Sequence, residues 1–106
     1  MISLEMLERA AKLLLDNSPA GLRVILFGSH ARHAAKNESD ADFLVIEPEV
    51  YNRHSEMVRL RQVMRPLRIP IDVVVISRSV FEDWKEIPNT VIYDAVKEGI
   101  EYGVAA

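Results

Sequence analysis

The first part of the chain has the hydrophobic spacing of an amphipathic helix. Apolar side chains recur every three or four residues between positions 4 and 16, which is the period of one helix face. These positions are Leu4, Leu7, Ala11 and Leu14. The Asn-Ser-Pro-Ala-Gly segment at 17–21 is expected to end this helix, because proline and glycine do not continue it.

Three short runs of almost continuous apolar residues are instead typical of strands buried on both faces. They occupy 22–27, 41–46 and 71–76, and each is bounded by glycine, proline or polar residues. Further helices are predicted over 30–35, where Ser29 could cap a short turn of helix, and over 53–67. A last helical segment, 79–98, is expected in two pieces broken near Pro88 and stopped by Gly99.

The predicted helix over 53–67 has two distinct faces. Its apolar stripe consists of Met57, Leu60, Met64 and Leu67, and its basic stripe consists of Arg61, Arg65 and Arg68. The basic stripe is interpreted first as the solvated face of the helix, and alternatively as a surface for RNA or for an acidic partner. Three strands that alternate with helices predict an α/β sandwich, organised as a single domain over 1–106.

Composition narrows the possible classes of protein. The 106 residues are 49% hydrophobic and 27% charged, which is usual for a globular domain. No cysteine is present, which excludes a disulfide framework, a thiolate zinc site and a cysteine nucleophile. No apolar run reaches the roughly 20 residues of a membrane span, and no signal pattern is visible, so a cytoplasmic location is expected. The net charge of −3 argues against attraction of the whole molecule to nucleic acid.

Three aspartates occupy positions where lone carboxylates are costly. Asp42 lies within the second predicted strand, Asp40 directly before it and Asp72 near the start of the third. Because side chains on a strand repeat every two residues, Asp40 and Asp42 face the same side. Carboxylate oxygens suit Mg²⁺, and three such groups could hold two ions about 3.5–4 Å apart. Such a pair of ions is typical of enzymes that catalyse in-line displacement at a phosphorus atom.

A second element of a phosphate site lies at the end of the first strand. Gly28 allows the backbone to approach a ligand closely, and Ser29 offers a hydroxyl group there. If this turn and the aspartates serve one site, the first two strands run antiparallel and the last two run parallel. The sheet is then small and mixed, which argues against a doubly wound dinucleotide-binding fold.

A family resemblance lies in three segments: Gly28-Ser29-His30-Ala31-Arg32, Ser39-Asp40-Ala41-Asp42 and Ile71-Asp72-Val73. They resemble the signature of the DNA polymerase β-like nucleotidyltransferases, and in particular the minimal nucleotidyltransferase (MNT) type. The resemblance implies that Asp40 and Asp42 bind two magnesium ions, while Asp72 contacts one ion and helps to activate the attacking hydroxyl. It also implies that Gly28 and Ser29 hold the triphosphate of ATP. Arg32 is a further candidate, for a contact with phosphate or with the partner.

The same resemblance implies a partner. MNT-type proteins typically act with a helical HEPN-domain protein in a toxin–antitoxin pair, in which the MNT protein transfers AMP to a tyrosine of the HEPN ribonuclease. The implied activity is therefore that of a protein adenylyltransferase. One departure is His33, which stands where the family commonly has glycine and could alter the nucleotide pocket.

Other interpretations of these residues remain open at the level of sequence. The chain could be an antitoxin that acts by occlusion without catalysis, or a nucleotidyltransferase for small molecules such as antibiotics. Arg32 could equally be a surface arginine, and Ser29 could be only a helix cap. A zinc site at His30 and His33 lacks a third ligand nearby.

Overall fold

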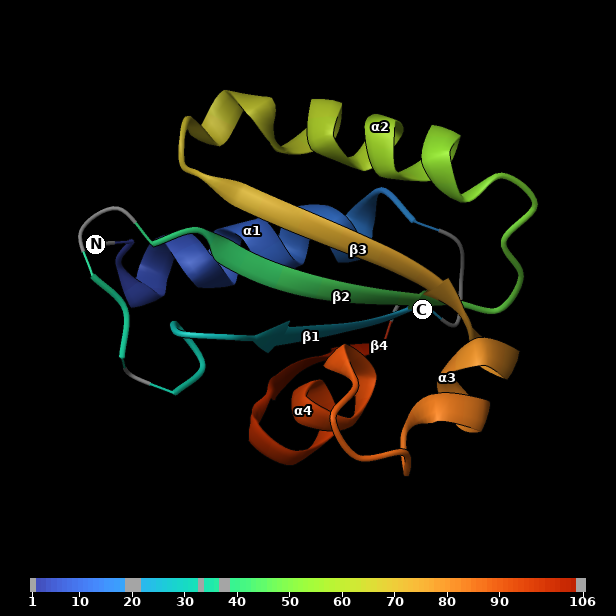
Figure 1. Cartoon of the computed structure of the whole chain (residues 1–106). Coiled ribbons are helices and arrows are strands. Elements are labelled where there is room, and N and C mark those ends of the chain that lie inside the picture. Colours follow the sequence, from blue (N-terminus) through green and yellow to red (C-terminus); the bar gives the residue numbers. More distant parts are fainter. Residues whose placement is uncertain (1, 19–21, 33, 37–38, 105–106) are drawn as a thin grey trace.

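Four strands and four α-helices build the chain, which we describe from a computed structural model over residues 2–18, 22–32, 34–36 and 39–104. The helices are α1 (Leu4–Asp16), α2 (Arg53–Met64), α3 (Arg78–Trp84) and α4 (Val91–Glu98), and a 3₁₀ turn, η1 (Arg65–Leu67), continues α2. The strands are β1 (Arg23–Phe27), β2 (Ala41–Glu47), β3 (Ile71–Ser77) and β4 (Ile100–Val104). Figure 1 shows how these elements are arranged.

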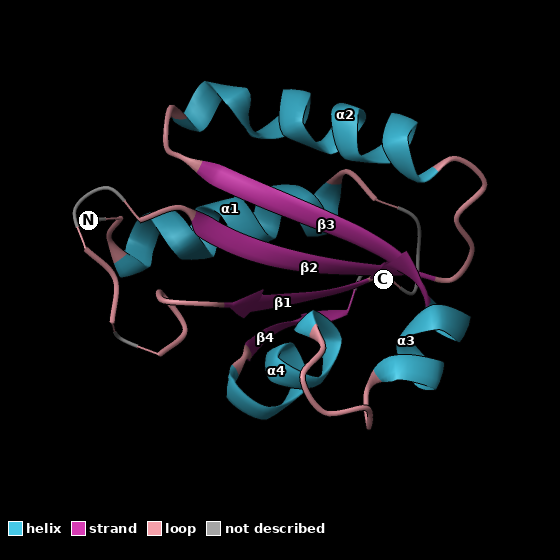
Figure 2. Ribbon diagram, in the orientation of Figure 1, coloured by secondary structure: helices cyan, strands magenta, loops and turns pink. Residues whose placement is uncertain are grey.

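The sheet is covered on both faces, as the sequence predicts (Figure 2). Helices α1 and α2 pack on one face, where Leu14 and Leu60 join Phe43 in a fully buried core. Helices α3 and α4 pack on the other face, where Phe81 and Ala95 meet the opposite side of the same strands. The result is an α+β fold with three layers. None of the helices in the described ranges is long and apolar enough to cross a membrane.

The predicted strand directions are confirmed. The strand order is β3-β2-β1-β4, with β1 antiparallel to β2 and β2 parallel to β3. Phe27, the last residue of β1, pairs with Asp42, and Asp42 pairs in turn with Asp72. The end of β1 and the beginnings of β2 and β3 therefore meet at one edge of the sheet. The strand β3 is the outer strand on this side of the sheet.

Two predictions of secondary structure are wrong. The sheet has a fourth strand, β4, which pairs antiparallel with β1 and which the pattern of three apolar runs does not indicate. The expected short helix over 30–35 is replaced, in the described residues, by turns at 28–32 and irregular chain at 34–36. There the backbone N–H of Arg32 donates to Gly28 over 3.2 Å, and the N–H of Ala34 donates to Ser29 over 2.9 Å, so the chain makes one wide turn and straightens.

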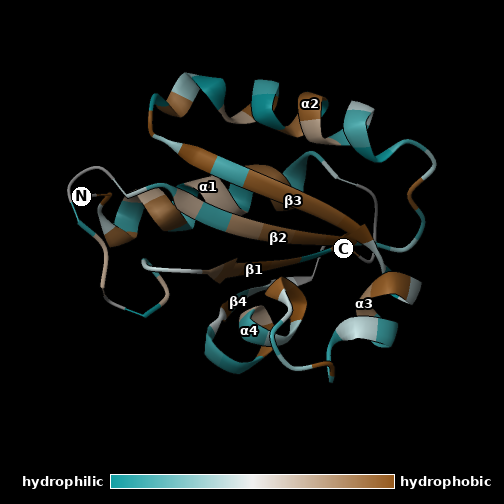
Figure 3. Ribbon diagram, viewed as in Figure 1, coloured by the Kyte–Doolittle hydropathy of each residue, from teal (hydrophilic) through white to brown (hydrophobic). Residues whose placement is uncertain are grey.

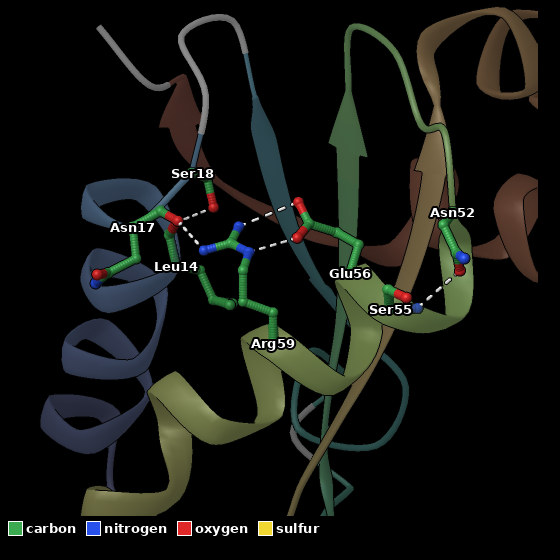
Figure 4. A network of polar contacts seen from close by, with 7 residues as sticks. All are labelled: Leu14, Asn17, Ser18, Asn52, Ser55, Glu56 and Arg59. Carbon is green, nitrogen blue, oxygen red and sulfur yellow. Dashed lines mark hydrogen bonds and ion pairs between the residues drawn. The ribbon is translucent and has the colours of Figure 1, made fainter.

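A polar network joins the two helices of one face at the far end of the sheet (Figure 4). The Arg59 guanidinium pairs with Glu56 and donates to the backbone oxygen of Asn17 over 2.7 Å, which fixes the end of α1 to α2. Glu47, at the end of β2, is buried beside this pair, and its Oε2 atom has no hydrogen-bond partner in the described part of the protein. Burial, and then the neighbouring Glu56 carboxylate, raise the pKa of Glu47 to about 8.

This buried carboxyl predicts a loss of stability toward alkaline pH. In the unfolded chain Glu47 has its ordinary pKa of 4.5, whereas in the folded protein its pKa is about 8. Between these values the folded state binds the extra proton, so the free energy of unfolding falls as pH rises from about 4.5 to about 8. Glu47→Gln should remove much of this decline, by more than about 1 kcal/mol. Chemical denaturation at several pH values measures it.

The exposed Glu86→Gln provides the matched control for that experiment, since it makes the same substitution without changing a buried group. We expect its profile to follow that of the original protein. If Glu47→Gln and the original protein lose stability equally between pH 5 and pH 8, the buried carboxyl does not stay protonated.

Candidate active site

Polar residues interrupt the apolar strands at one edge of the sheet. The beginnings of β2 and β3 each show a hydrophilic band within an otherwise hydrophobic strand (Figure 3). Asp42 and Asp72 are the second residues of these two strands, where they are paired neighbours in the sheet and half-buried. Asp40 precedes β2 and is exposed. The fold thus brings the start of two strands with aspartates to the turn that ends β1.

Gly28 is the residue that lets the turn pack against Asp42. Its φ angle is +76°, a left-handed conformation that glycine adopts with little strain. A Cβ atom at this position would lie 2.4 Å from Oδ2 of Asp42. The absence of a side chain therefore leaves the Asp42 carboxylate in direct contact with the backbone of the turn, and places the two predicted halves of the site together.

The electrostatics of Asp42 reflect this crowded position. Burial raises the pKa of Asp42, and the negative charges of Asp72 and Asp40 raise it further. The nearby His30 and Arg32 lower it in part. Three carboxylates that repel one another at the edge of a core are stabilised by a bound cation.

His30 holds the turn in place, a role that the sequence does not indicate. The side chain is buried, and its Nε2 atom lies 3.1 Å from the backbone oxygen of Ser39, directly before Asp40. It therefore links the turn after β1 to the start of β2, close to the carboxylates. His33, which stands where the family commonly has glycine, lies outside the described residues.

Two arginines also contact the neighbourhood of the site. Arg32 forms an ion pair of 3.3 Å with Glu98 on α4, and both side chains are about half exposed. Arg61, on α2, reaches the edge of the sheet and forms an ion pair of 3.4 Å with Oδ1 of Asp72. The three arginines of the basic stripe are exposed, as expected for a solvated face, and one of them also contacts a predicted site residue.

The donor set at this edge suits a magnesium ion. Asp40, Asp42 and Asp72 offer only carboxylate oxygens, the ligands that this hard cation prefers. Their mutual repulsion, which raises the pKa of Asp42, is what a cation would relieve. Across the described residues, however, no three acidic, histidine or cysteine side chains are already gathered as a metal cluster. In this structure the Asp72 carboxylate accepts a hydrogen bond from Arg61.

The comparison with protein families assigns the chain to a class. A mixed sheet with paired aspartates beside a Gly-Ser turn is the arrangement that the sequence motifs predict for nucleotidyltransferases. A family model described as the nucleotidyltransferase domain matches residues 7–102. The chain belongs to this nucleotidyltransferase domain family. No curated protein sequence matches it.

Solved structures share the fold at low sequence identity. A crystal structure of a toxin–antitoxin with AMP-PNP is 21% identical, with a TM-score of 0.65 over 91% of this chain and 72% of that chain. The complex of a tri-AMPylated Shewanella oneidensis HEPN toxin with its MNT antitoxin gives 19% identity and a TM-score of 0.61, over 94% and 72% of the two chains. A candidate nucleotidyltransferase from Sulfolobus solfataricus gives 19% and 0.62, over 92% and 77%. These matches confirm the predicted fold.

Proposed function

We propose that this chain is a Mg²⁺-dependent adenylyltransferase that moves AMP from ATP to a hydroxyl of a HEPN-type partner protein and thereby acts as its antitoxin. The observation that carries the proposal is the meeting of Asp42, Asp72 and the Gly28 turn at one edge of the sheet. Membership of the nucleotidyltransferase domain family supports the reaction type. The same proposal includes that residues 1–106 form a single nucleotidyltransferase domain and that the protein acts in the cytoplasm.

The carboxylates would divide the chemistry between them. Asp40, Asp42 and Asp72 would hold two magnesium ions, which offset the charge of the phosphates and lower the pKa of the acceptor hydroxyl. Asp72, on the outer strand β3, is the carboxylate best placed to meet an acceptor that approaches from outside the sheet and to take up its proton. The acceptor oxygen forms a bond to the α-phosphorus of ATP, and pyrophosphate leaves.

The turn after β1 would bind the triphosphate. Gly28 has no side chain between the backbone and the carboxylates, so phosphate oxygens could approach both. Ser29 follows with a hydroxyl group, and His30 fixes the position of the turn against Ser39. Arg32 would add positive charge if its ion pair with Glu98 opens. These residues orient the nucleotide and do not carry the proton transfer.

The structural relatives support the choice of nucleotide and partner. One solved relative is a toxin–antitoxin with AMP-PNP, an ATP analogue, and another is an MNT antitoxin in complex with an AMPylated HEPN toxin. By analogy, ATP is the proposed donor and a HEPN-type protein is the proposed acceptor.

Labelling the partner tests the proposal directly. The protein is incubated with Mg²⁺, ATP labelled in the adenine and the product of the neighbouring gene, as the proposed HEPN-type partner. We expect label on the partner, and a double variant with Asp40→Ala and Asp42→Ala should reduce it about a thousandfold or more. Label that persists at the original level in this double variant would contradict the assignment of the carboxylates.

A further inference from the structure

A basic pocket lies beside the candidate site, on the outer edge of β3. It has a volume of about 280 Å³ and is lined by Arg61, Met64, Arg65, Ile69 and Ile71. The first three come from the end of α2 and the start of η1, and the last is the residue before Asp72. The end of α2 and the beginning of β3 lie on the same side of the molecule (Figure 1). Ile71 faces α2, whereas Asp72, the next residue along the strand, projects to the other face of the sheet, so the pocket and the site lie on either side of the edge strand β3. Arg61 connects them, because it lines the pocket and also pairs with Oδ1 of Asp72 over 3.4 Å.

Positive charge dominates the pocket. Arg61 and Arg65 are both exposed, and within the described residues Arg65 forms no ion pair or side-chain hydrogen bond. Arg68, which is not among the lining residues, ends η1 with a φ of 54°. The acidic group nearest to the two lining arginines is Asp72, which already pairs with Arg61. The pocket thus has guanidinium groups at its rim and an apolar floor of Met64, Ile69 and Ile71.

We propose that this pocket recognises an acidic segment of the protein that accepts the nucleotide, with a carboxylate on Arg65 and the acceptor hydroxyl beside Asp72. The inference rests on the proposed function, because it says where the acceptor protein binds at the same active site. Guanidinium and carboxylate groups match in charge and geometry, and their hydrogen bonds are stronger than neutral ones. The apolar floor provides a contact for the aliphatic or aromatic neighbour of the acidic residue.

A protein segment fits this pocket better than a nucleic acid. Stable binding to nucleic acid requires many phosphate contacts, and the stripe has only three arginines in a protein of net charge −3. One or two carboxylates on a peptide match the number of guanidinium groups at the rim.

Recognition of this kind would also change the site. Arg61 pairs with Asp72 in the free protein, with both side chains about half exposed. A carboxylate that enters the pocket competes for Arg61 and weakens its contact with Asp72. The carboxylate of Asp72 would then be free to face the acceptor hydroxyl. Acceptor binding and the availability of Asp72 are thus coupled through one arginine.

Peptide binding tests the proposal without relying on catalysis. Fluorescein-labelled peptides of equal length carry one tyrosine flanked by glutamates or by lysines, and their affinities are measured by fluorescence anisotropy. We expect the glutamate peptide to bind about tenfold more tightly. Arg65→Glu should reverse the preference, because it places a negative charge at the rim. Arg78→Glu, the same change beyond the opposite end of β3, should leave the preference unchanged.

Several outcomes would overturn the inference. These are equal affinity for the two peptides, no binding of either at millimolar concentration, and an unchanged preference in Arg65→Glu. Tighter binding of a ten-nucleotide single-stranded RNA than of the glutamate peptide would assign the pocket to nucleic acid. Transfer of label to the HEPN-type protein is measured separately. Transfer without a preference for the glutamate peptide contradicts only the proposed role of the pocket. A preference without transfer contradicts only the proposed adenylyltransferase activity.

Discussion

Changing Asp42 to asparagine should lower AMP transfer about a thousandfold or more and yet make the folded protein more stable. The loss of activity follows if the Asp42 carboxylate binds the cations that neutralise the phosphates. The gain in stability follows because burial, Asp72 and Asp40 raise the pKa of Asp42, so that the ionised side chain is less favourable in the folded than in the unfolded protein. Asparagine keeps the shape of the side chain and removes its charge. An increase of about 0.5–1 kcal/mol is expected.

Urea denaturation at pH 7 and the labelling assay measure the two effects on the same preparation. The exposed Asp83→Asn is the matched control, since it removes one charge from α3 away from the site. We expect this control to change neither quantity appreciably. The prediction is a loss of transfer together with a gain in stability. If Asp42→Asn is less stable than the original protein, the carboxylate has a structural partner. If Asp42→Asn remains active, Asp42 does not belong to the active site.

Changing Gly28 to alanine should disrupt both the turn and the position of Asp42. A side chain at φ +76° is strained, and the new Cβ would lie 2.4 Å from Oδ2 of Asp42, so the carboxylate must move. We expect a decrease of about 1–3 kcal/mol in the free energy of unfolding. Transfer should fall at least about a hundredfold, because small displacements of reacting groups are costly.

A double-mutant cycle separates backbone strain from the contact with the carboxylate. In the Asp42→Ala background the clashing oxygen is absent, so Gly28→Ala should cost less stability than it does in the original protein. The remaining cost then measures the strain of the left-handed backbone alone. Equal costs in the two backgrounds would show that Asp42 and Gly28 do not touch in solution.

Much of the fold follows from local pattern. The run of β-branched residues around Val73 and Val75 defines a buried strand, and the spacing of Leu7 and Leu14 defines a helix, because each signal is repeated several times along its element. The directions of the strands could be predicted as well. They follow from the single assumption that Gly28, Asp42 and Asp72 serve one site, which fixes the ends of the strands that must meet.

The features that sequence does not predict depend on distant contacts. The five residues of β4 include Gly103 and become a strand because β1 offers a free edge. Ser29 suggests a helix cap, but the chain after it is held by His30 against Ser39 and makes only turns in the described residues. The ion pair between Arg61 and Asp72 joins a helix to the outer strand, and no spacing along the chain specifies it.

The position of the label within ATP tests the central claim most directly. The protein, Mg²⁺ and the HEPN-type partner are incubated in parallel with ATP labelled at the α-phosphorus and with ATP labelled at the γ-phosphorus. The proposed function predicts that only the α-label becomes attached to the partner, with one pyrophosphate released for each AMP transferred. Attachment of the γ-label would indicate phosphoryl transfer, and the absence of both labels from the partner would contradict the assignment of this chain as its adenylyltransferase.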